Sequence, residues 1–261
     1  MAGSVLVSVA SRVARVTLNR PEVHNAFDDR LIDELTAVFT RLAGLADVRA
    51  VVLAANGRSF SAGADLNWMK RTAGYSQDQN LADARRLAGM LKALDRMPQP
   101  TLALVQGPAY GGGVGLVAAC DIAVAVPEAA FSLSEVKLGL LPAAISPYVV
   151  AAIGARQARR YFLTAERFDA AEAMRIGLVH TLAAREELEP TGSAILKALA
   201  DGGPEAQAAS KALIARVAGA AIDDALIEDT ATRIAALRAG AEGREGIAAF
   251  LEKRAPRWRE P

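Results

Sequence analysis

One glutamate stands in an otherwise apolar segment and is the clearest candidate for acid–base chemistry. Glu135 lies in the run Phe131-Ser-Leu-Ser-Glu-Val-Lys-Leu-Gly-Leu-Leu-Pro. Burial among apolar neighbours raises the pKa of a carboxyl group toward the range in which it exchanges protons near neutral pH. The alternative for Glu135 is an ordinary helix-capping or surface glutamate. The segment is therefore compatible with a general acid–base group and with a structural one.

Two segments rich in small residues could supply backbone N–H groups to a developing oxyanion. The first spans residues 57–66 and the second spans residues 107–116, which reads Gly-Pro-Ala-Tyr-Gly-Gly-Gly-Val-Gly-Leu. Both follow a predicted strand and precede a helical pattern, and a helix start offers unpaired N–H groups and a positive dipole end. Two such segments at neighbouring strand ends could each direct one N–H at a single carbonyl oxygen. One donor of this kind typically lowers a barrier by about 3 kcal/mol.

The glycine-rich segment has two other interpretations. Residues 113–118 read Gly-Val-Gly-Leu-Val-Ala and fit the dinucleotide-binding pattern Gly-x-Gly-x-x-Gly/Ala. That pattern needs its first glycine in a tight turn after the strand, whereas residues 106–112 intervene here. The helix also ends before Asp121, which is early for a βαβ unit of roughly 30 residues. The glycines could alternatively do no more than let a helix pack closely on a sheet.

Residues that other chemistries require are scarce. Cys120 is the single cysteine, and His24 and His180 are the two histidines. One cysteine cannot form an intrachain disulfide or a multi-cysteine metal site. The sequence contains no Gly-x-Ser-x-Gly elbow, no Gly-x4-Gly-Lys-Ser/Thr phosphate loop and no His-Glu-x-x-His pair. Serine-hydrolase, nucleotide-hydrolysis and zinc-protease chemistry are not expected, and both histidines are predicted to be structural.

The composition is that of an ordinary globular protein. The 261 residues include 30 Lys and Arg against 29 Asp and Glu, a formal charge of +1, and 52% are hydrophobic. The absence of a basic excess argues against nucleic acid or an anionic membrane as a partner. The longest apolar run, residues 114–127, is interrupted by Asp121, so no membrane segment is expected. Without a secretory signal, and with a single cysteine, the chain is expected in the cytoplasm.

Strand and helix patterns alternate along most of the chain. A hairpin is predicted from 5–9 and 12–18, followed by a helix that Asp28 or Asp29 caps and Gly44 ends. Further strands are predicted at 50–54, 101–105 and 122–126, with helices at 80–96 and directly before Cys120. This alternation predicts an α/β fold with a largely parallel sheet.

The last part of the chain has a different character. Ala, Leu, Glu and Arg dominate from residue 204 to 254, which predicts a helical C-terminal region interrupted at Gly202-Gly203, Gly219 and Gly243. We therefore divide the chain into a core of residues 1–195 that holds the candidate site and a helical region of residues 196–261.

The three candidate segments, in this order, resemble the crotonase family of enoyl-CoA hydratases and isomerases. The resemblance covers essentially the whole chain. It runs through Asn19-Arg-Pro-Glu-Val-His-Asn-Ala, Phe60-Ser-Ala-Gly-Ala-Asp-Leu, Gly111-Gly-Gly, Cys120-Asp-Ile-Ala, Phe162-Leu-Thr-Ala-Glu and Gly177-Leu-Val. It implies a ββα spiral core and a helical C-terminal region that packs on a neighbouring subunit, in a homotrimer or a dimer of trimers. The implied substrate is an acyl-CoA thioester, with CoA as part of the substrate and no metal or redox cofactor.

The resemblance also implies roles for individual residues. The thioester carbonyl is expected to accept the N–H groups of Ala62 and Gly112, and Glu135 is expected to perform the proton chemistry. Further substrate contacts are implied for Ala64, Asp65, Leu66 and Gly115, and for Phe250 and Lys253, which would meet the adenine and phosphates of CoA.

One position departs from the family pattern. Hydratases that this chain resembles commonly carry two glutamates that hold and activate water, and the second falls on Gly115. A single glutamate at the position of Glu135 is similar to the 3,2-enoyl-CoA isomerases, in which one base moves a proton between C2 and C4. The alternatives to a hydratase are therefore an isomerase, another crotonase reaction such as decarboxylation or thioester hydrolysis, and a homologue that binds acyl-CoA without catalysis.

Finer resemblance favours hydration. Residues 65–71, 111–118 and 133–150 look like the bacterial branch assigned to methylglutaconyl-CoA or carboxygeranoyl-CoA hydration, in leucine and acyclic-terpene breakdown. The distal carboxylate of such a substrate could complement a site that lacks one glutamate. The sequence is thus interpreted as an enoyl-CoA hydratase for a branched or carboxylated substrate.

Overall fold

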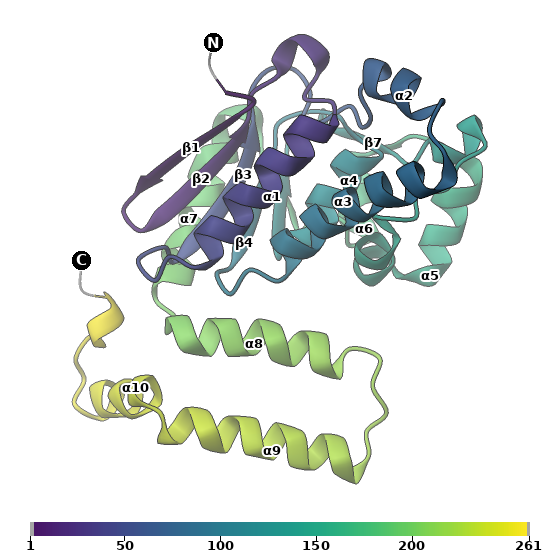
Figure 1. Cartoon of the computed structure of the whole chain (residues 1–261). Helices are drawn as coiled ribbons and strands as arrows, with labels where there is room; N and C mark the ends of the chain where they lie inside the picture. The colour runs from purple at the N-terminus through teal and green to yellow at the C-terminus, as the bar shows by residue number, and fades with distance from the viewer. Residues whose placement is uncertain (1–2, 260–261) are drawn as a thin grey trace.

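The computed structural model describes residues 3–259 and contains two sheets and a layer of C-terminal helices (Figure 1). The larger sheet has the strand order β1-β2-β3-β4-β6-β9, and the smaller has the order β5-β7-β8. The strands are β1 (Val5–Ala10), β2 (Val13–Leu18), β3 (Ala50–Ala55), β4 (Thr101–Val105), β5 (Ala109–Tyr110), β6 (Ile122–Ala125), β7 (Ala130–Ser132), β8 (Phe168–Asp169) and β9 (Thr181–Leu182). The α-helices are α1 (Asp29–Ala43), α2 (Leu66–Thr72), α3 (Gln77–Asp95), α4 (Gly112–Ala119), α5 (Ser146–Thr164), α6 (Ala170–Arg175), α7 (Leu188–Ala200), α8 (Pro204–Val217), α9 (Asp224–Ala239) and α10 (Ala241–Leu251). Short 3-10 helices are η1 (Pro21–Val23), η2 (Glu135–Leu138), η3 (Arg185–Glu187) and η4 (Arg257–Arg259).

The larger sheet confirms the predicted hairpin and parallel strands. β1 and β2 pair antiparallel, whereas β2, β3, β4, β6 and β9 pair in parallel along the sheet. β3 and β4 are almost wholly buried, in keeping with continuous apolar runs in strands covered on both faces. α1 and α3 lie side by side over one face, and α7 lies behind the other (Figure 1).

α1 begins and ends at the predicted signals. The Asp28 side chain accepts a hydrogen bond from the Leu31 N–H at 2.8 Å, which satisfies one of the free donors at the start of the helix. Gly44 follows the last helical residue. The side chains of Leu31, Leu35 and Phe39 recur at helical spacing and are fully buried. The predicted helix at 80–96 begins three residues earlier, at Gln77, because Ser76 forms a reciprocal capping box with Gln79.

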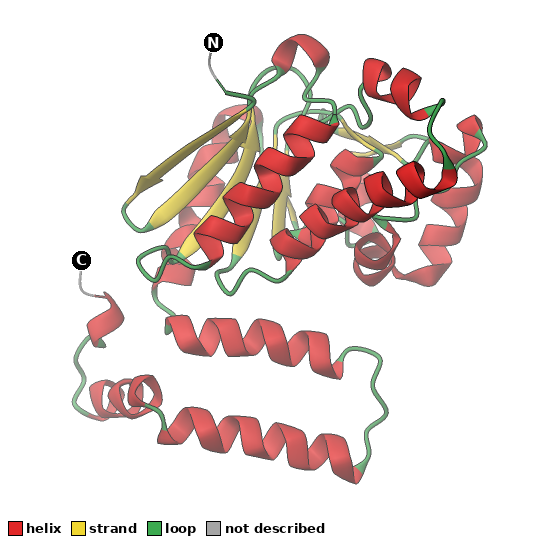
Figure 2. Cartoon of the chain, viewed as in Figure 1, coloured by secondary structure: helices red, strands yellow, loops and turns green. Residues whose placement is uncertain are grey.

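The C-terminal helices α8, α9 and α10 form a layer without strands below the sheet (Figure 2). α7 packs against β4 and β6, so the layer that stands apart begins at α8 rather than at residue 196. The expectation that Gly243 interrupts a helix is wrong, because Gly243 lies inside α10 and the break falls at Gly240. A Cβ on Gly243 would lie 2.1 Å from the Leu237 carbonyl oxygen, so this glycine permits a close approach of α10 to the end of α9.

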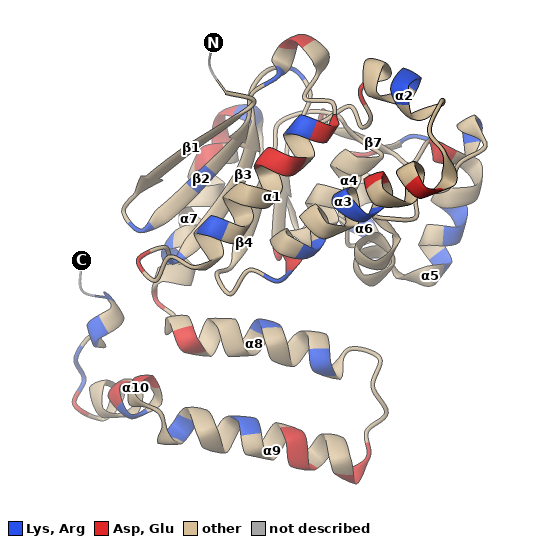
Figure 3. Cartoon of the chain, in the orientation of Figure 1, with Lys and Arg blue, Asp and Glu red and all other residues tan. Residues whose placement is uncertain are grey.

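Charged residues of both signs are mixed over the elements, and α9 carries both (Figure 3). Within residues 3–259 no helix is both long and apolar enough to cross a membrane.

Candidate active site

The segment from Phe60 to Asp65 is held between two other segments by backbone hydrogen bonds. On one side Ser61 forms a parallel bridge with Ala109, in which the Tyr110 N–H donates to the Ser61 carbonyl oxygen at 2.8 Å. On the other side Ala64 forms a parallel bridge with Phe27. The segment thus spans the space between residues 26–28 and the approach to α4, and both flanks fix its backbone.

Ala64 presents a free N–H group at this position. The Phe27 N–H donates to the Gly63 carbonyl oxygen at 2.7 Å, and the Asp65 N–H donates to the Phe27 carbonyl oxygen at 2.8 Å. Because N–H directions alternate along an extended backbone, the N–H of Ala64 points away from Phe27. Ala64 is exposed, and no acceptor among residues 3–259 takes its N–H.

The expectation that Ala62 supplies the donor is wrong. The Ala62 N–H donates to the His24 carbonyl oxygen at 2.9 Å and is unavailable to a ligand. The free N–H of this segment therefore belongs to Ala64, two residues further along the chain, for which the resemblance implied only a general substrate contact.

The second donor, Gly112, lies at the start of α4. Gly111 adopts a φ of +49°, a backbone conformation that favours glycine, and its N–H donates to the Ser132 carbonyl oxygen at 2.9 Å. The turn exposes the N–H of Gly112, which has no acceptor within the described part of the chain. A Cβ on Gly63 would lie 3.1 Å from the Tyr110 carbonyl oxygen and 3.9 Å from the Gly111 Cα, so the two donor segments touch.

Glu135 lies beside the turn at Gly111 that leads to Gly112. It begins the short helix η2, and a Cβ on Gly111 would lie 3.2 Å from its Oε1 atom. Its Oε2 atom is buried and has no hydrogen-bond partner in residues 3–259. Burial raises the pKa of Glu135, and a hydrogen bond from its own backbone N–H offsets part of that rise. The arrangement places a carboxylate with one unpaired oxygen next to Gly111, the residue that precedes the free N–H of Gly112.

Gly115 faces an aliphatic side chain instead of the site. A Cβ at Gly115 would lie 2.3 Å from Cγ2 and 2.9 Å from Cβ of Ile145, and 3.6 Å from Leu91. Gly115 is itself buried, and its N–H donates to the Gly111 carbonyl oxygen at 3.2 Å. Since both its α-carbon and its N–H are covered, the prediction that Gly115 contacts substrate is wrong. The position of a second glutamate is filled by Ile145.

Other predicted residues have different positions. The Asp65 carboxylate caps α2 by accepting from the N–H groups of Asn67 and Trp68, so it acts on the protein itself. Leu66 is 73% exposed at the start of α2. Phe250 and Lys253 are not brought to Glu135 within one chain, because α10 lies at the far end of the molecule from α2 and β7 (Figure 1).

The histidines and the cysteine take structural positions. His24 Nδ1 lies 3.1 Å from Ser59 Oγ, and His180 Nδ1 accepts the Ala123 N–H at 3.2 Å. Burial, reinforced by the charge of Asp121, raises the pKa of the Cys120 thiol to about 12, which suppresses its thiolate. Residues 3–259 contain no cluster of His, Cys, Asp or Glu suited to a metal ion.

Sequence reasoning missed two residues that shape the site. Ile145 covers Gly115, and the Phe27 ring lies against Gly112, whose Cβ would be 3.1 Å from two ring carbons. Both lie outside the three segments that carried the chemical argument. The signal that could have identified Phe27 is a large apolar residue next to a polar loop, in the run Asn-Ala-Phe-Asp at residues 25–28.

Comparisons with known proteins identify the family and the fold. Residues 8–261 match the model of the enoyl-CoA hydratase/isomerase family. The structure of an enoyl-CoA hydratase from Shewanella pealeana superposes with a TM-score of 0.96 at 44% identity, covering 98% of this chain and 96% of that one. An enoyl-CoA hydratase/isomerase from Marinobacter aquaeolei gives 0.92 at 35% identity, covering 98% and 99%. The enoyl-CoA hydratase ACTT6 of Alternaria alternata is 36% identical over 239 residues, 90% of this chain and 77% of that protein. The predicted fold class is confirmed.

Proposed function

The chain belongs to the enoyl-CoA hydratase/isomerase family, and from this premise we propose that it adds water across the 2,3 double bond of an enoyl-CoA thioester. The observation that carries the proposal is the juxtaposition of the Glu135 carboxylate with the unpaired N–H groups of Ala64 and Gly112. Relatives and structural neighbours named enoyl-CoA hydratases support the same activity.

The two N–H groups act on the thioester carbonyl. When a nucleophile adds to C3, negative charge collects on the carbonyl oxygen as an enolate. Donors fixed by folding stabilise that charge without reorganising, and the loss of one typically costs 10²–10³ in kcat, about 3–4 kcal/mol. Ala64 and Gly112 are held by the backbone contacts of two different segments, so their spacing is set before substrate binds.

Glu135 transfers the proton. As the oxygen of a water molecule bonds to C3, the Glu135 carboxylate accepts a proton from that water. Glu135 then delivers the same proton to C2 of the enolate. The water O–H bond breaks, C3–O and C2–H bonds form, and Glu135 returns to its ionised state. A raised pKa suits both halves of this cycle, because the carboxyl group must first gain and then lose the proton.

The acyl group in this proposal is branched or carboxylated, as in methylglutaconyl-CoA. The Gly115 position offers no room for a substrate carboxylate, because Ile145 fills it. A cation elsewhere supports the proposal. The Arg167 guanidinium stacks 5.1 Å over the Tyr110 ring, next to Gly111, and joins no ion pair within the described residues. Such a substrate would link the enzyme to leucine or acyclic-terpene breakdown.

Isomerisation is the second candidate, and the lone carboxylate favours it. Purified protein assayed with crotonyl-CoA, methylglutaconyl-CoA and a 3-enoyl-CoA separates the candidates by product analysis. We expect hydration, fastest with methylglutaconyl-CoA, and a higher KM for that substrate alone in Arg167→Gln, with crotonyl-CoA as internal control. Turnover confined to the 3-enoyl-CoA identifies an isomerase. Binding of CoA thioesters without any turnover identifies a non-catalytic homologue.

We also propose that the protein is a homotrimer or a dimer of trimers. The C-terminal layer exposes large apolar side chains that a monomer would leave in water, namely Ile214, Val217, Ile222, Ile227, Ile234, Ile247, Phe250 and Leu251. In an assembly, a neighbouring chain could supply Phe250 and Lys253 to CoA. Light scattering is expected to give three or six times the mass of one chain, and a monomer contradicts the proposal.

A further inference from the structure

The backbone of Phe27 fixes the orientation of one donor. Its N–H and carbonyl groups bond to Gly63 and Asp65 on either side of Ala64, at 2.7 and 2.8 Å. A displacement of Phe27 therefore displaces Ala64 and turns its N–H.

The ring of the same residue contacts the other donor. Phe27 is 1% exposed, and a Cβ on Gly112 would lie 3.1 Å from both Cδ2 and Cε2 of the ring. The ring thus packs close to the Gly112 α-carbon, at a distance that a Cβ there could share only if the ring moved by a few tenths of an ångström. One residue touches the first donor through its backbone and the second through its side chain.

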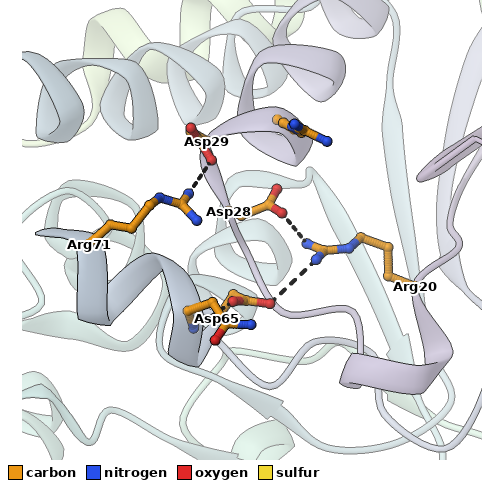
Figure 4. A pocket seen from close by; sticks show the side chains of 7 residues that line it. Arg20, Asp28, Asp29, Asp65 and Arg71 are labelled. Atoms are coloured by element: carbon orange, nitrogen blue, oxygen red, sulfur yellow. Dashed lines mark hydrogen bonds and ion pairs between the residues drawn. The ribbon is translucent and has the colours of Figure 1, made fainter.

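Arg20 anchors the segment that carries Phe27. Its Nη1 donates to the Ala26 carbonyl oxygen at 2.8 Å. The same Nη1 lies 3.0 Å from Asp28 Oδ2, and its Nη2 lies 3.4 Å from Asp65 Oδ2 (Figure 4). Asp28 and Asp65 cap the starts of α1 and α2. The guanidinium is mostly buried between the two carboxylates and ties the residues on either side of the Phe27–Ala64 bridge together.

We propose that Phe27 is a positioning residue that sets the separation of the two N–H donors and thereby the polarisation of the thioester carbonyl. The inference rests on the proposed function, since it assigns the donors to a thioester. Phe27 acts through Ala64 and Gly112 and need not touch the reacting atoms. The Phe27 ring also favours glycine at position 112, because a Cβ there would require the ring to shift.

The test uses a buried phenylalanine elsewhere as a matched control. Phe27→Ala removes the ring beside Gly112 but keeps the backbone bonds to Gly63 and Asp65. Phe39→Ala removes a fully buried ring about three turns into α1, so it makes a core cavity of the same kind. Phe27→Leu keeps most of the core volume without the flat ring and serves if the alanine variant does not fold.

Two readouts separate positioning from general destabilisation. The first is steady-state kinetics on the substrate that the wild type turns over. The second is the isotope-edited infrared carbonyl stretch of bound butyryl-CoA labelled with ¹³C at the thioester carbon, a saturated probe that cannot be hydrated. Hydrogen bonds to the carbonyl oxygen lower that frequency, so it reports donor placement directly.

We expect Phe27→Ala to lower kcat about 10- to 100-fold with KM changed less than about threefold, and to lose part of the frequency shift. Phe39→Ala is expected to retain the shift and most of kcat. Gly112→Ala is expected to harm the wild type more than the Phe27→Ala background, where its Cβ has space.

The outcomes distinguish the two levels of the argument. If Phe27→Ala or Phe27→Leu shows the full infrared shift of the wild type, the positioning role is overturned and the proposed function remains intact. Equal losses of kcat and of the infrared shift in Phe27→Ala and Phe39→Ala also overturn the positioning role and leave the proposed function intact. A wild type that does not shift the carbonyl frequency overturns the proposed function and, with it, this inference.

Discussion

The two places at which the family pattern expects glutamates differ completely in this chain. Glu135 is a carboxylate beside two free N–H groups, with one oxygen buried and unpaired. Gly115, one helical turn beyond Gly111, is sealed by Ile145 and Leu91. The difference teaches that the absence of a glutamate at position 115 leaves no empty space there. Aliphatic packing by Ile145 and Leu91 takes the place of that side chain, so Glu135 is the one carboxylate at the two expected positions.

The largest expected effect is the loss of that single carboxylate. Glu135→Gln keeps the shape of the side chain and removes its proton chemistry, so kcat should fall about 10²–10⁴-fold, measured on the best substrate of the panel. Turnover that survives this change would show that another group performs the acid–base step.

The stability of the same variant is its control. Since the pKa of Glu135 is raised by burial, the stability it confers is present below its unfolded-state pKa and is lost as pH rises through the folded-state pKa. Gln cannot ionise and avoids that loss. The free energy of unfolding of Glu135→Gln at neutral pH should therefore equal or exceed that of the wild type, which excludes misfolding as the cause of inactivity.

The packing around Gly115 is tested by adding one methyl group at that position. Gly115→Ala forces a Cβ against Ile145 and should lower the free energy of unfolding by about 1–3 kcal/mol, measured by denaturant titration. Gly89→Ala in α3 is the matched control, because nothing lies within 4 Å of its Cβ. That substitution should be neutral or stabilise by up to about 1 kcal/mol, since alanine favours helix. Equal responses at both glycines would mean that Ile145 does not fill the site.

The smallest expected effect concerns pH. If Glu135 must be ionised to accept a proton, kcat/KM falls as pH decreases through its pKa, and burial moves that acidic limb above the ordinary range of a glutamate. A pH–rate profile of the wild type checks the position of the limb. An acidic limb at or below the usual glutamate pKa would contradict the interpretation of Glu135 as a buried, lone base. It would also weaken the contrast between the positions of Glu135 and Gly115.

Local patterns predicted most of the fold. The apolar runs of β3 and β4, the Asp28 cap and the helical spacing of α1 all depend on residues close in sequence. Glu135 could be singled out for the same reason, because its apolar context is local.

The remaining features depend on contacts between distant parts of the chain. The free N–H belongs to Ala64 rather than Ala62 because Phe27 and His24 take the neighbouring backbone groups. Ile145 covers Gly115 from a segment thirty residues later along the chain. Gly243 permits a close helix contact, whereas its type alone suggested a helix end. Sequence patterns carry no register between such segments, so these assignments required the folded structure.

The burial of α4 has a consequence for motion. Six of its eight residues are buried, and the donor Gly112 begins the same helix. Folding of the chain, and not closure of a loop over the ligand, orders the N–H of Gly112. The conformational entropy of ordering this group is therefore not lost again in each catalytic cycle. Opening of this helix to solvent would expose the centre of the core. The amide protons of α4 should then exchange only through the largest opening events of the molecule, and the active site should lose its donor only when the core itself comes apart.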